Sequence, residues 1–200
     1  MNEQKEIVGV ILAAGLSSRM GQFKQLLPID GRPAVCRIAR VLKENLRQVI
    51  VVVGYRAQEV QDALSGINVE CVINQDYRDG MLSSVQSAVR EIGPSRDYLF
   101  CLGDQPSLNE DIVQAVVHQA LKVDAGIVVP TYHGKKGHPL FLRRSYGPAI
   151  LKLEQGVGLN VITRNNSQDT VEVPVKYKEI LQDMDTPADY VREKTRAMKD

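Results

Sequence analysis

The sequence has no tryptophan, only 5% aromatic residues, three cysteines and no hydrophobic run long enough to span a membrane. So few aromatic side chains give little support for the stacking platforms that bind single-stranded nucleic acids. The net charge is +1 and the charges are interspersed, so neither a nucleic-acid nor an anionic membrane partner is indicated. The cysteines lie far apart without a CxxC pair, which argues against a disulfide framework and against a zinc site.

The N-terminal segment is equally plain, because residues 1–6 are polar and partly acidic and carry no apolar leader core. We therefore expect a reduced, cytoplasmic, globular protein. The 200 residues suit one domain, and the sequence shows no repeat, low-complexity run or linker. The prediction is a single domain over residues 1–200.

Short apolar, β-rich runs alternate with amphipathic helical patterns along most of the chain. The helical patterns include residues 33–42, with Pro33 in the first turn, and residues 109–123, with Asn109 as the cap. This alternation predicts an α/β fold with three layers, αβα, around a mainly parallel sheet. The expected strands cover residues 7–12, 49–53, 69–73, 98–102, 126–130, 140–142 and 170–173.

In such sheets ligands bind beyond the carboxyl ends of the strands. The first strand ends in Leu12, and the small residues Ala13, Ala14 and Gly15 follow it, so a base or ribose can approach the backbone. The loop contains neither the glycine pattern of a P-loop nor that of a dinucleotide-binding fold.

Glycines, hydroxyls and two cations complete the loop over residues 15–24. Gly15 and Gly21 allow positive φ, and with the hydroxyls of residues 17 and 18 the backbone N–H groups can converge on one anion. Arg19 and Lys24 supply positive charge. By itself, the pattern also fits an ordinary loop with two solvated cations.

Polar residues follow other strands as well. Gly80, Ser83 and Ser84 stand where a helix begins, and they fit either a ligand contact or simple N-capping. Asp104 follows the strand 98–102 and offers a hard carboxylate suited to Mg²⁺, although an Asp in a tight turn has the same pattern.

Two later stretches are also candidates. Lys135, Lys136 and His138 lie in a basic, glycine-rich loop that can face an anionic acceptor, whereas a histidine in a turn is often merely exposed. Near the C-terminus either Asp185 or Thr186 can cap a helix.

Taken together, these stretches resemble a known family. The segment LAAGLSSRMGQFK at residues 12–24 resembles the nucleotide loop of nucleotidyltransferases, and among them the molybdenum cofactor cytidylyltransferases. The segments GDQP at residues 103–106, GHP at residues 137–139 and DMDTP at residues 183–187 extend the resemblance over essentially the whole chain. It implies a Rossmann-like nucleotidyltransferase domain with a mixed, mainly parallel sheet.

The resemblance also implies roles for individual residues. Asp104 and Asp185 would bind Mg²⁺, with Asp183 as the alternative to Asp185. The nucleotide contacts would be Leu12, Ala13, Ala14, Gly15, Gly80, Ser83 and Ser84. The catalytic residues would be Arg19, Lys24, Asp104 and His138, the last as an acceptor contact or as an acid or base.

The implied reaction is cytidylyl transfer from CTP to the phosphate of molybdopterin, with release of pyrophosphate. The resemblance implies CTP rather than GTP as the nucleotide. The loop here reads Leu-Ala-Ala-Gly, with Ala14 as its third residue, whereas the corresponding loop of the guanylyl relatives resembles Leu-Ala-Gly-Gly. The implied protein partner is a molybdenum hydroxylase such as xanthine dehydrogenase. The alternatives are transfer to a sugar or polyol phosphate and a non-catalytic, cofactor-binding maturation partner of such a hydroxylase.

Overall fold

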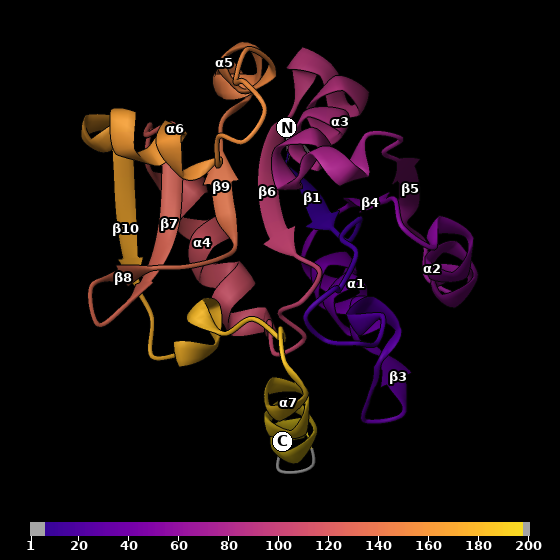
Figure 1. The fold of residues 1–200 in the computed structure, drawn as a ribbon. Coiled ribbons are helices and arrows are strands. Elements are labelled where there is room, and N and C mark those ends of the chain that lie inside the picture. Colours follow the sequence, from indigo (N-terminus) through magenta and orange to yellow (C-terminus); the bar gives the residue numbers. More distant parts are fainter. Residues whose placement is uncertain (1–6, 198–200) are drawn as a thin grey trace.

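A mixed sheet of eight strands forms the centre of the computed structural model, which describes residues 7–197 (Figure 1). The ends of the predicted domain, including the segment 1–6 on which the leader argument rests, lie outside the described residues. The strands are β1 (Ile7–Leu12), β4 (Gln48–Val53), β5 (Glu70–Ile73), β6 (Asp97–Leu102), β7 (Ile127–Tyr132), β8 (Lys135–Lys136), β9 (Leu140–Leu142) and β10 (Thr170–Pro174).

The strand order is β10-β7-β9-β6-β1-β4-β5, and β8 pairs with β7. Neighbours among β6, β1, β4 and β5 are all parallel, as are β7 and β10. β9 is antiparallel to both β6 and β7, and β8 is antiparallel to β7. The prediction of a mainly parallel, mixed sheet is therefore confirmed.

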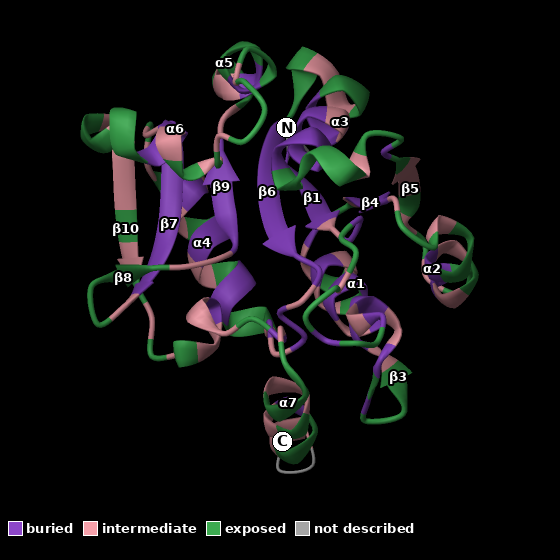
Figure 2. Cartoon of the chain, in the orientation of Figure 1, coloured by how far each residue is buried: buried purple, intermediate pink, exposed green. Residues whose placement is uncertain are grey.

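Helices cover both faces of this sheet. α1 (Ala34–Asn45), α2 (Ala57–Leu64) and α4 (Glu110–Lys122) pack on one face, and α3 (Met81–Ile92), α5 (Gly147–Leu151) and α6 (Asn160–Asn165) pack on the other. Side chains alternate along β1. Ile7 and Ile11 pack in the core on the side of α1, α2 and α4, and Val8 and Val10 pack in the core on the side of α3, α5 and α6. The central strands are almost entirely buried (Figure 2), as a three-layer fold requires.

A smaller apolar cluster lies beyond the carboxyl end of the sheet. It joins the hairpin of β2 (Pro28–Ile29) and β3 (Arg32–Pro33) to the segment that precedes α7 (Pro187–Ala197), and Met20 and Met184 are both buried in it. The C-terminal helix is thereby held near the strand ends (Figure 1).

Element boundaries differ from the predictions by a few residues. Pro33 immediately precedes α1 rather than lying in its first turn, and the helix continues to Asn45. The predicted cap of α4 is confirmed, since Asn109 Oδ1 accepts a hydrogen bond from the Ile112 N–H at 3.0 Å.

The loops after β1 and β6 leave the sheet side by side, because Leu12 and Leu102 are partners in the parallel register. Gly103 N donates to Leu12 O at 3.0 Å, and a Cβ at Gly103 would lie 2.7 Å from that oxygen. Only glycine fits this close approach, which places Asp104 beside the loop that follows β1. Within residues 7–197, none of the helices has the length and apolar character that a membrane crossing requires.

Candidate functional site

The loop after β1, the turn after β6 and the N-terminus of α3 surround a pocket of about 340 Å³. Five of the predicted nucleotide contacts line it, namely Leu12, Ala14, Gly15, Gly80 and Ser84. Ala13 and Ser83 do not line it, and both are buried. Tyr77, Arg78 and Met81 also line the pocket and were not among the predicted contacts.

A charge cluster lies at the edge of this pocket. Lys24 Nζ is 2.5 Å from Asp104 Oδ2 and 2.8 Å from Asp185 Oδ1, and Arg19 Nη1 is 3.0 Å from Asp185 Oδ2. The side chain of Lys24 is 12% exposed, whereas that of Arg19 is 78% exposed. Four residues from three separate stretches of the sequence thus form one contiguous group.

Burial and ion pairing act in opposite directions on this cluster. Burial disfavours the Lys24 ammonium, but the adjacent Asp104 and Asp185 carboxylates outweigh it and raise the pKa of Lys24. Burial raises the pKa of Asp104, and the Lys24 ammonium limits that rise. Lys24 therefore stays protonated over the physiological pH range.

The donor set suits a divalent cation such as Mg²⁺. Asp104 Oδ1 is buried without a hydrogen-bond partner, and the paired oxygens of Asp104 and Asp185 converge on the single ammonium of Lys24. Among the described residues no three His, Cys, Asp or Glu side chains form a metal-binding group. Two carboxylates are nevertheless sufficient for Mg²⁺, whose remaining ligands are usually water and substrate phosphate oxygens.

The loop after β1 is stabilised by contacts that the sequence did not indicate. Ser17 Oγ accepts a hydrogen bond from Lys24 N at 3.1 Å and donates one to Gln25 Oε1 at 2.9 Å. Gly21 has the expected positive φ of 69°, but at the start of the loop the left-handed residue is Ser17 (φ 55°) and not Gly15. Of the two glycines for which the sequence allows a positive φ, only Gly21 therefore adopts one.

A second pocket of about 350 Å³ adjoins the first and shares Leu12 and Met81 with it. The loop that carries His138 lines one side, and residues 158–160 line another. His138 Nδ1 lies 3.4 Å from Phe100 O, and burial lowers the pKa of the imidazole. A neutral ring that donates through Nδ1 keeps Nε2 as a hydrogen-bond acceptor. Lys136 also lines this pocket but is paired with Glu172 at 3.1 Å, and Lys135 does not line it.

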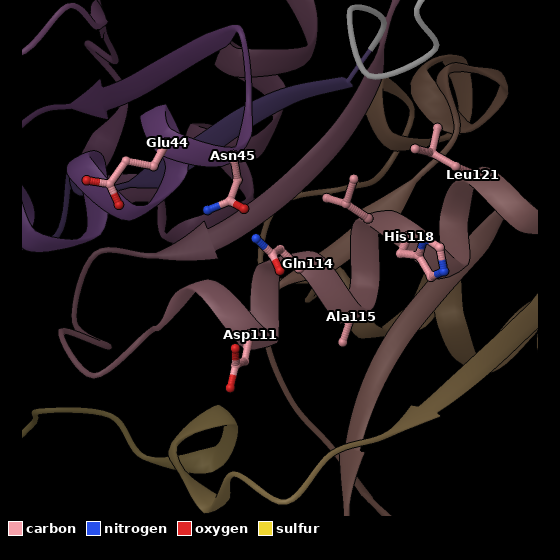
Figure 3. A pocket seen from close by; sticks show the side chains of 8 residues that line it. Glu44, Asn45, Asp111, Gln114, Ala115, His118 and Leu121 are labelled. Carbon is pink, nitrogen blue, oxygen red and sulfur yellow. The ribbon is translucent and has the colours of Figure 1, made fainter. Parts of the chain in front are cut away.

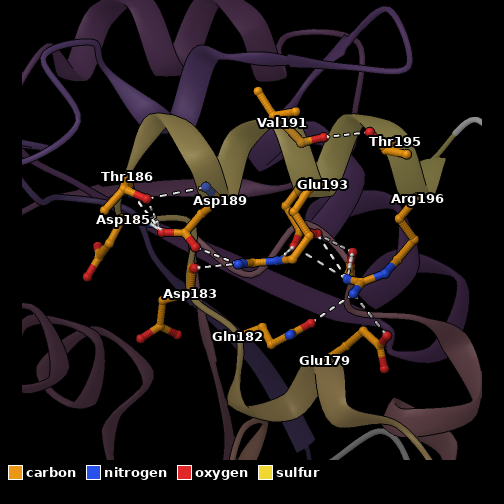
Figure 4. Close-up of polar contacts among 12 residues, drawn as sticks. Glu179, Gln182, Asp183, Asp185, Thr186, Asp189, Val191, Glu193, Thr195 and Arg196 are labelled. Carbon is orange, nitrogen blue, oxygen red and sulfur yellow. Dashed lines mark hydrogen bonds and ion pairs between the residues drawn. The ribbon is translucent and has the colours of Figure 1, made fainter.

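Contacts from α7 fix the segment that carries Asp185 (Figure 4). Asp189 Oδ2 accepts from the N–H groups of Asp185 and Thr186 at 3.2 and 2.8 Å, and Arg192 Nη2 donates to Asp183 O at 3.2 Å. Thr186 Oγ1 in turn accepts from Asp189 N at 3.3 Å, so Thr186 and not Asp185 caps the helix. The Asp185 carboxylate is therefore free to face Lys24.

The same network separates the two candidate aspartates. Gln105 Nε2 donates to Asp183 Oδ1 at 2.9 Å, while Asp185 is the one that meets Lys24. A buried carboxylate, Glu193, joins α7 to Ser107 in the turn after Asp104 and pairs with Arg196 at 3.3 Å. Side chains of α7 therefore contact both the turn that follows Asp104 and the segment that carries Asp185.

A larger pocket, of about 700 Å³, lies elsewhere (Figure 3). It is formed by the C-terminal end of α1 and by one side of α4, with Asn45 and Gln114 among its lining residues. None of the predicted site residues lines it. The charge cluster is the better candidate for the functional site, although the pockets beside it are smaller, because it has paired charges and a carboxylate oxygen without a hydrogen-bond partner.

The sequence is similar to known proteins over most of its length. Residues 9–171 match the family model of the MobA-like NTP transferase domain. The chain is 31% identical over 189 residues to the molybdenum cofactor cytidylyltransferase of Escherichia coli, covering 94% of this chain and 95% of that protein.

Solved structures are similar over nearly the whole chain. A nucleotidyl transferase from Methanothermobacter superposes with a TM-score of 0.83 at 25% identity, covering 96% of this chain and 98% of that one. The Mycobacterium tuberculosis protein Rv0371c, solved as a complex with manganese, has a TM-score of 0.77 at 25% identity and covers 95% and 98%.

Proposed function

The chain belongs to the family of MobA-like NTP transferase domains, and from this premise we propose that it transfers a cytidylyl group from CTP to the phosphate of molybdopterin. The observation that carries the proposal is the Lys24–Asp104–Asp185 cluster, which lies where a nucleotide pocket adjoins a second pocket. The relative with 31% identity is named as a cytidylyltransferase for the molybdenum cofactor, which supports this choice of substrates.

In the proposed reaction the terminal phosphate of the acceptor attacks the α-phosphorus of CTP in line, and pyrophosphate leaves. The attacking oxygen is already anionic, so no protein nucleophile is required. Catalysis then consists of positioning and charge stabilisation. The Lys24 ammonium and the Arg19 guanidinium would offset the charge that accumulates on pyrophosphate, with help from the backbone N–H groups of the loop after β1.

Asp104 and Asp185 would hold Mg²⁺ through the oxygens that now face Lys24 and through the unpartnered Asp104 Oδ1. When bound, such a cation neutralises phosphate charge as a Lewis acid. Lys24 would then turn from the carboxylates toward the phosphates, because Mg²⁺ would replace its ammonium as the partner of Asp104 and Asp185.

The pocket beside His138 is the proposed acceptor site. Neutral His138 would accept a hydrogen bond through Nε2 from the acceptor, and Lys136, two residues earlier in the same loop, would attract its phosphate. Leu12 and Met81 would separate the two substrates while allowing their phosphates to meet.

The choice of CTP is based on Ala14, which lines the proposed nucleotide pocket. We further propose that the reaction takes place in the cytoplasm, and that residues 1–200 act as one domain. Delivery of the product to a molybdenum hydroxylase such as xanthine dehydrogenase stays a prediction. Transfer to a sugar or polyol phosphate is the alternative for the same site.

The decisive experiment measures pyrophosphate release with Mg²⁺ and molybdopterin, comparing CTP with GTP, UTP and ATP. Turnover with CTP that disappears in Asp104→Asn supports the proposal. Turnover only with a sugar or polyol phosphate would favour the alternative acceptor. Binding of the finished nucleotide cofactor without any pyrophosphate release would instead favour a non-catalytic maturation partner.

A further inference from the structure

A buried asparagine lies behind the nucleotide pocket, directly after β5. Asn74 is only 2% exposed, and its side chain makes three hydrogen bonds. Nδ2 donates to Ser83 Oγ at 2.8 Å and to Ser84 Oγ at 3.0 Å, and Oδ1 accepts from Asp76 N at 2.9 Å. The amide therefore uses both of its donor hydrogens on the first turns of α3.

The orientation of this amide is fixed by its surroundings. Asp76 N–H can only donate, so the atom of Asn74 that faces it must be the acceptor oxygen. The NH₂ group must then face the two serines. A flipped amide would set two donors against each other beside Asp76 and leave a buried donor unpaired, which is costly.

The two serines differ in what their own protons can do. Ser83 Oγ accepts from Asn74 and donates to Gly80 O at 2.8 Å, so its hydrogen-bonding capacity is used inside the protein. Ser84 Oγ also accepts from Asn74, but among residues 7–197 its proton has no acceptor. Ser84 lines the nucleotide pocket with Ala14 and Gly15, whereas Ser83 does not.

We propose that Asn74 is a positioning residue that makes Ser84 a hydrogen-bond donor toward an acceptor atom of the bound nucleoside. The inference depends on the proposed function in that the pocket must bind a nucleotide. The ligand atom is a ring nitrogen, a carbonyl oxygen or a ribose oxygen, and a donor group such as an exocyclic amine is disfavoured there. Ser83 would have only a structural role, in which its hydrogen bond to Gly80 O holds the start of α3 in place.

The test is calorimetric titration of Mg²⁺–nucleotide in the absence of any acceptor, with the four common nucleoside triphosphates as probes. Ser84→Ala should weaken the preferred nucleotide about tenfold, the effect of one hydrogen bond. Asn74→Asp should weaken it at least as much, because a carboxylate accepts the Ser84 proton and reverses the direction of that bond. Ser87→Ala is the matched control: its hydroxyl lies one turn further along α3 and donates to Ser83 O.

The double variant separates positioning from simple support of the fold. If Asn74 acts through Ser84, Asn74→Asp costs little further affinity once Ser84 is alanine, whereas additive losses would overturn the proposal. Thermal unfolding of each variant identifies any that fail to fold, and Ser84→Ala alone then decides.

Three results give clear outcomes. Equal affinity of wild type and Ser84→Ala overturns the inference while the proposed function stands. Wild type that binds none of the four nucleotides overturns both. With 2′-deoxy-CTP, a Ser84→Ala effect that vanishes identifies the ribose 2′-oxygen as the acceptor, and one that persists points to another nucleoside acceptor; both support the proposal.

Discussion

Lys24 Nζ and Asp104 Oδ2 lie 2.5 Å apart although 80 residues separate them in the chain. Lys24 also pairs with Asp185, so one ammonium joins the strand-end turn to the segment before α7. The same two carboxylates are the proposed ligands of Mg²⁺. The Lys24 ammonium therefore neutralises both carboxylates in this structure, and under the proposed function Mg²⁺ would take its place beside them.

Replacing Lys24 with Met should remove a charge that the transition state needs and leave two carboxylates facing each other. We expect activity to fall a hundredfold or more. We also expect a lower melting temperature without metal, because Asp104 is largely buried and loses its partner. Mg²⁺ should restore much of that stability in the variant and add less to the wild type.

Thermal unfolding with and without Mg²⁺ measures the second effect independently of activity. Lys122→Met is the control, since Lys122 is exposed on α4, remote from the cluster. A variant whose melting temperature responds to Mg²⁺ no more than the wild type does would contradict the paired-cation argument.

Arg192→Ala tests whether α7 positions Asp185. Without Arg192 the Asp183 carbonyl loses a donor and Asp189 loses its ion pair, so the acidic segment is held less firmly. The Mg²⁺ concentration for half-maximal activity should rise several-fold, with a smaller change in the rate at saturating Mg²⁺. Lys194→Ala, an exposed position on the same helix, is the control. An equal change in both variants, or a loss of rate that Mg²⁺ does not relieve, would exclude this role.

How much of this site was visible in the sequence depended on whether a residue followed a strand. Asp104 and Gly80 were found because they stand after predicted strands, and Asp185 was found through the family resemblance. Asn74 also follows a strand, but no motif distinguishes a buried asparagine from an exposed one. Its role depends on where α3 packs, which is a tertiary property.

The sequence also did not predict which residue at the start of the loop after β1 adopts a positive φ. Glycine is the residue that adopts positive φ most easily, yet Ser17 does so here, because its hydroxyl bonds both Lys24 N and Gln25. Similarly, either Asp185 or Thr186 satisfied the capping pattern. In the structure Thr186 accepts the capping hydrogen bond, whereas the Asp185 carboxylate pairs with Lys24.

His138 gives a prediction for the pH dependence of stability. Burial lowers its pKa from 6.5, so the unfolded chain takes up a proton before the folded protein does. The contribution of neutral His138 is fully present above pH 6.5 and is lost as the pH falls through the lower pKa of the folded state. A glutamine at this position cannot titrate.

Urea unfolding of wild type and His138→Gln between pH 5 and about 8 tests this sign. The free energy of unfolding of the wild type should decline relative to the variant on the acid side of the ordinary histidine pKa. A difference that is constant over the whole range would show that His138 has the same pKa in both states.

Ala14→Gly tests the choice of nucleotide. The Ala14 side chain lies against Gly54, where an added Cβ would come within 2.9 Å of it, so its methyl group has a fixed place in the pocket wall. Removing that methyl enlarges the pocket on the nucleotide side, and one methyl-sized difference changes discrimination by about 1–3 kcal/mol. We expect the ratio of kcat/KM for CTP to that for GTP to fall about tenfold or more, mainly through improved use of GTP. Because general damage to the enzyme lowers both values together, the ratio is its own control, and an unchanged ratio would show that base selection lies elsewhere in the pocket.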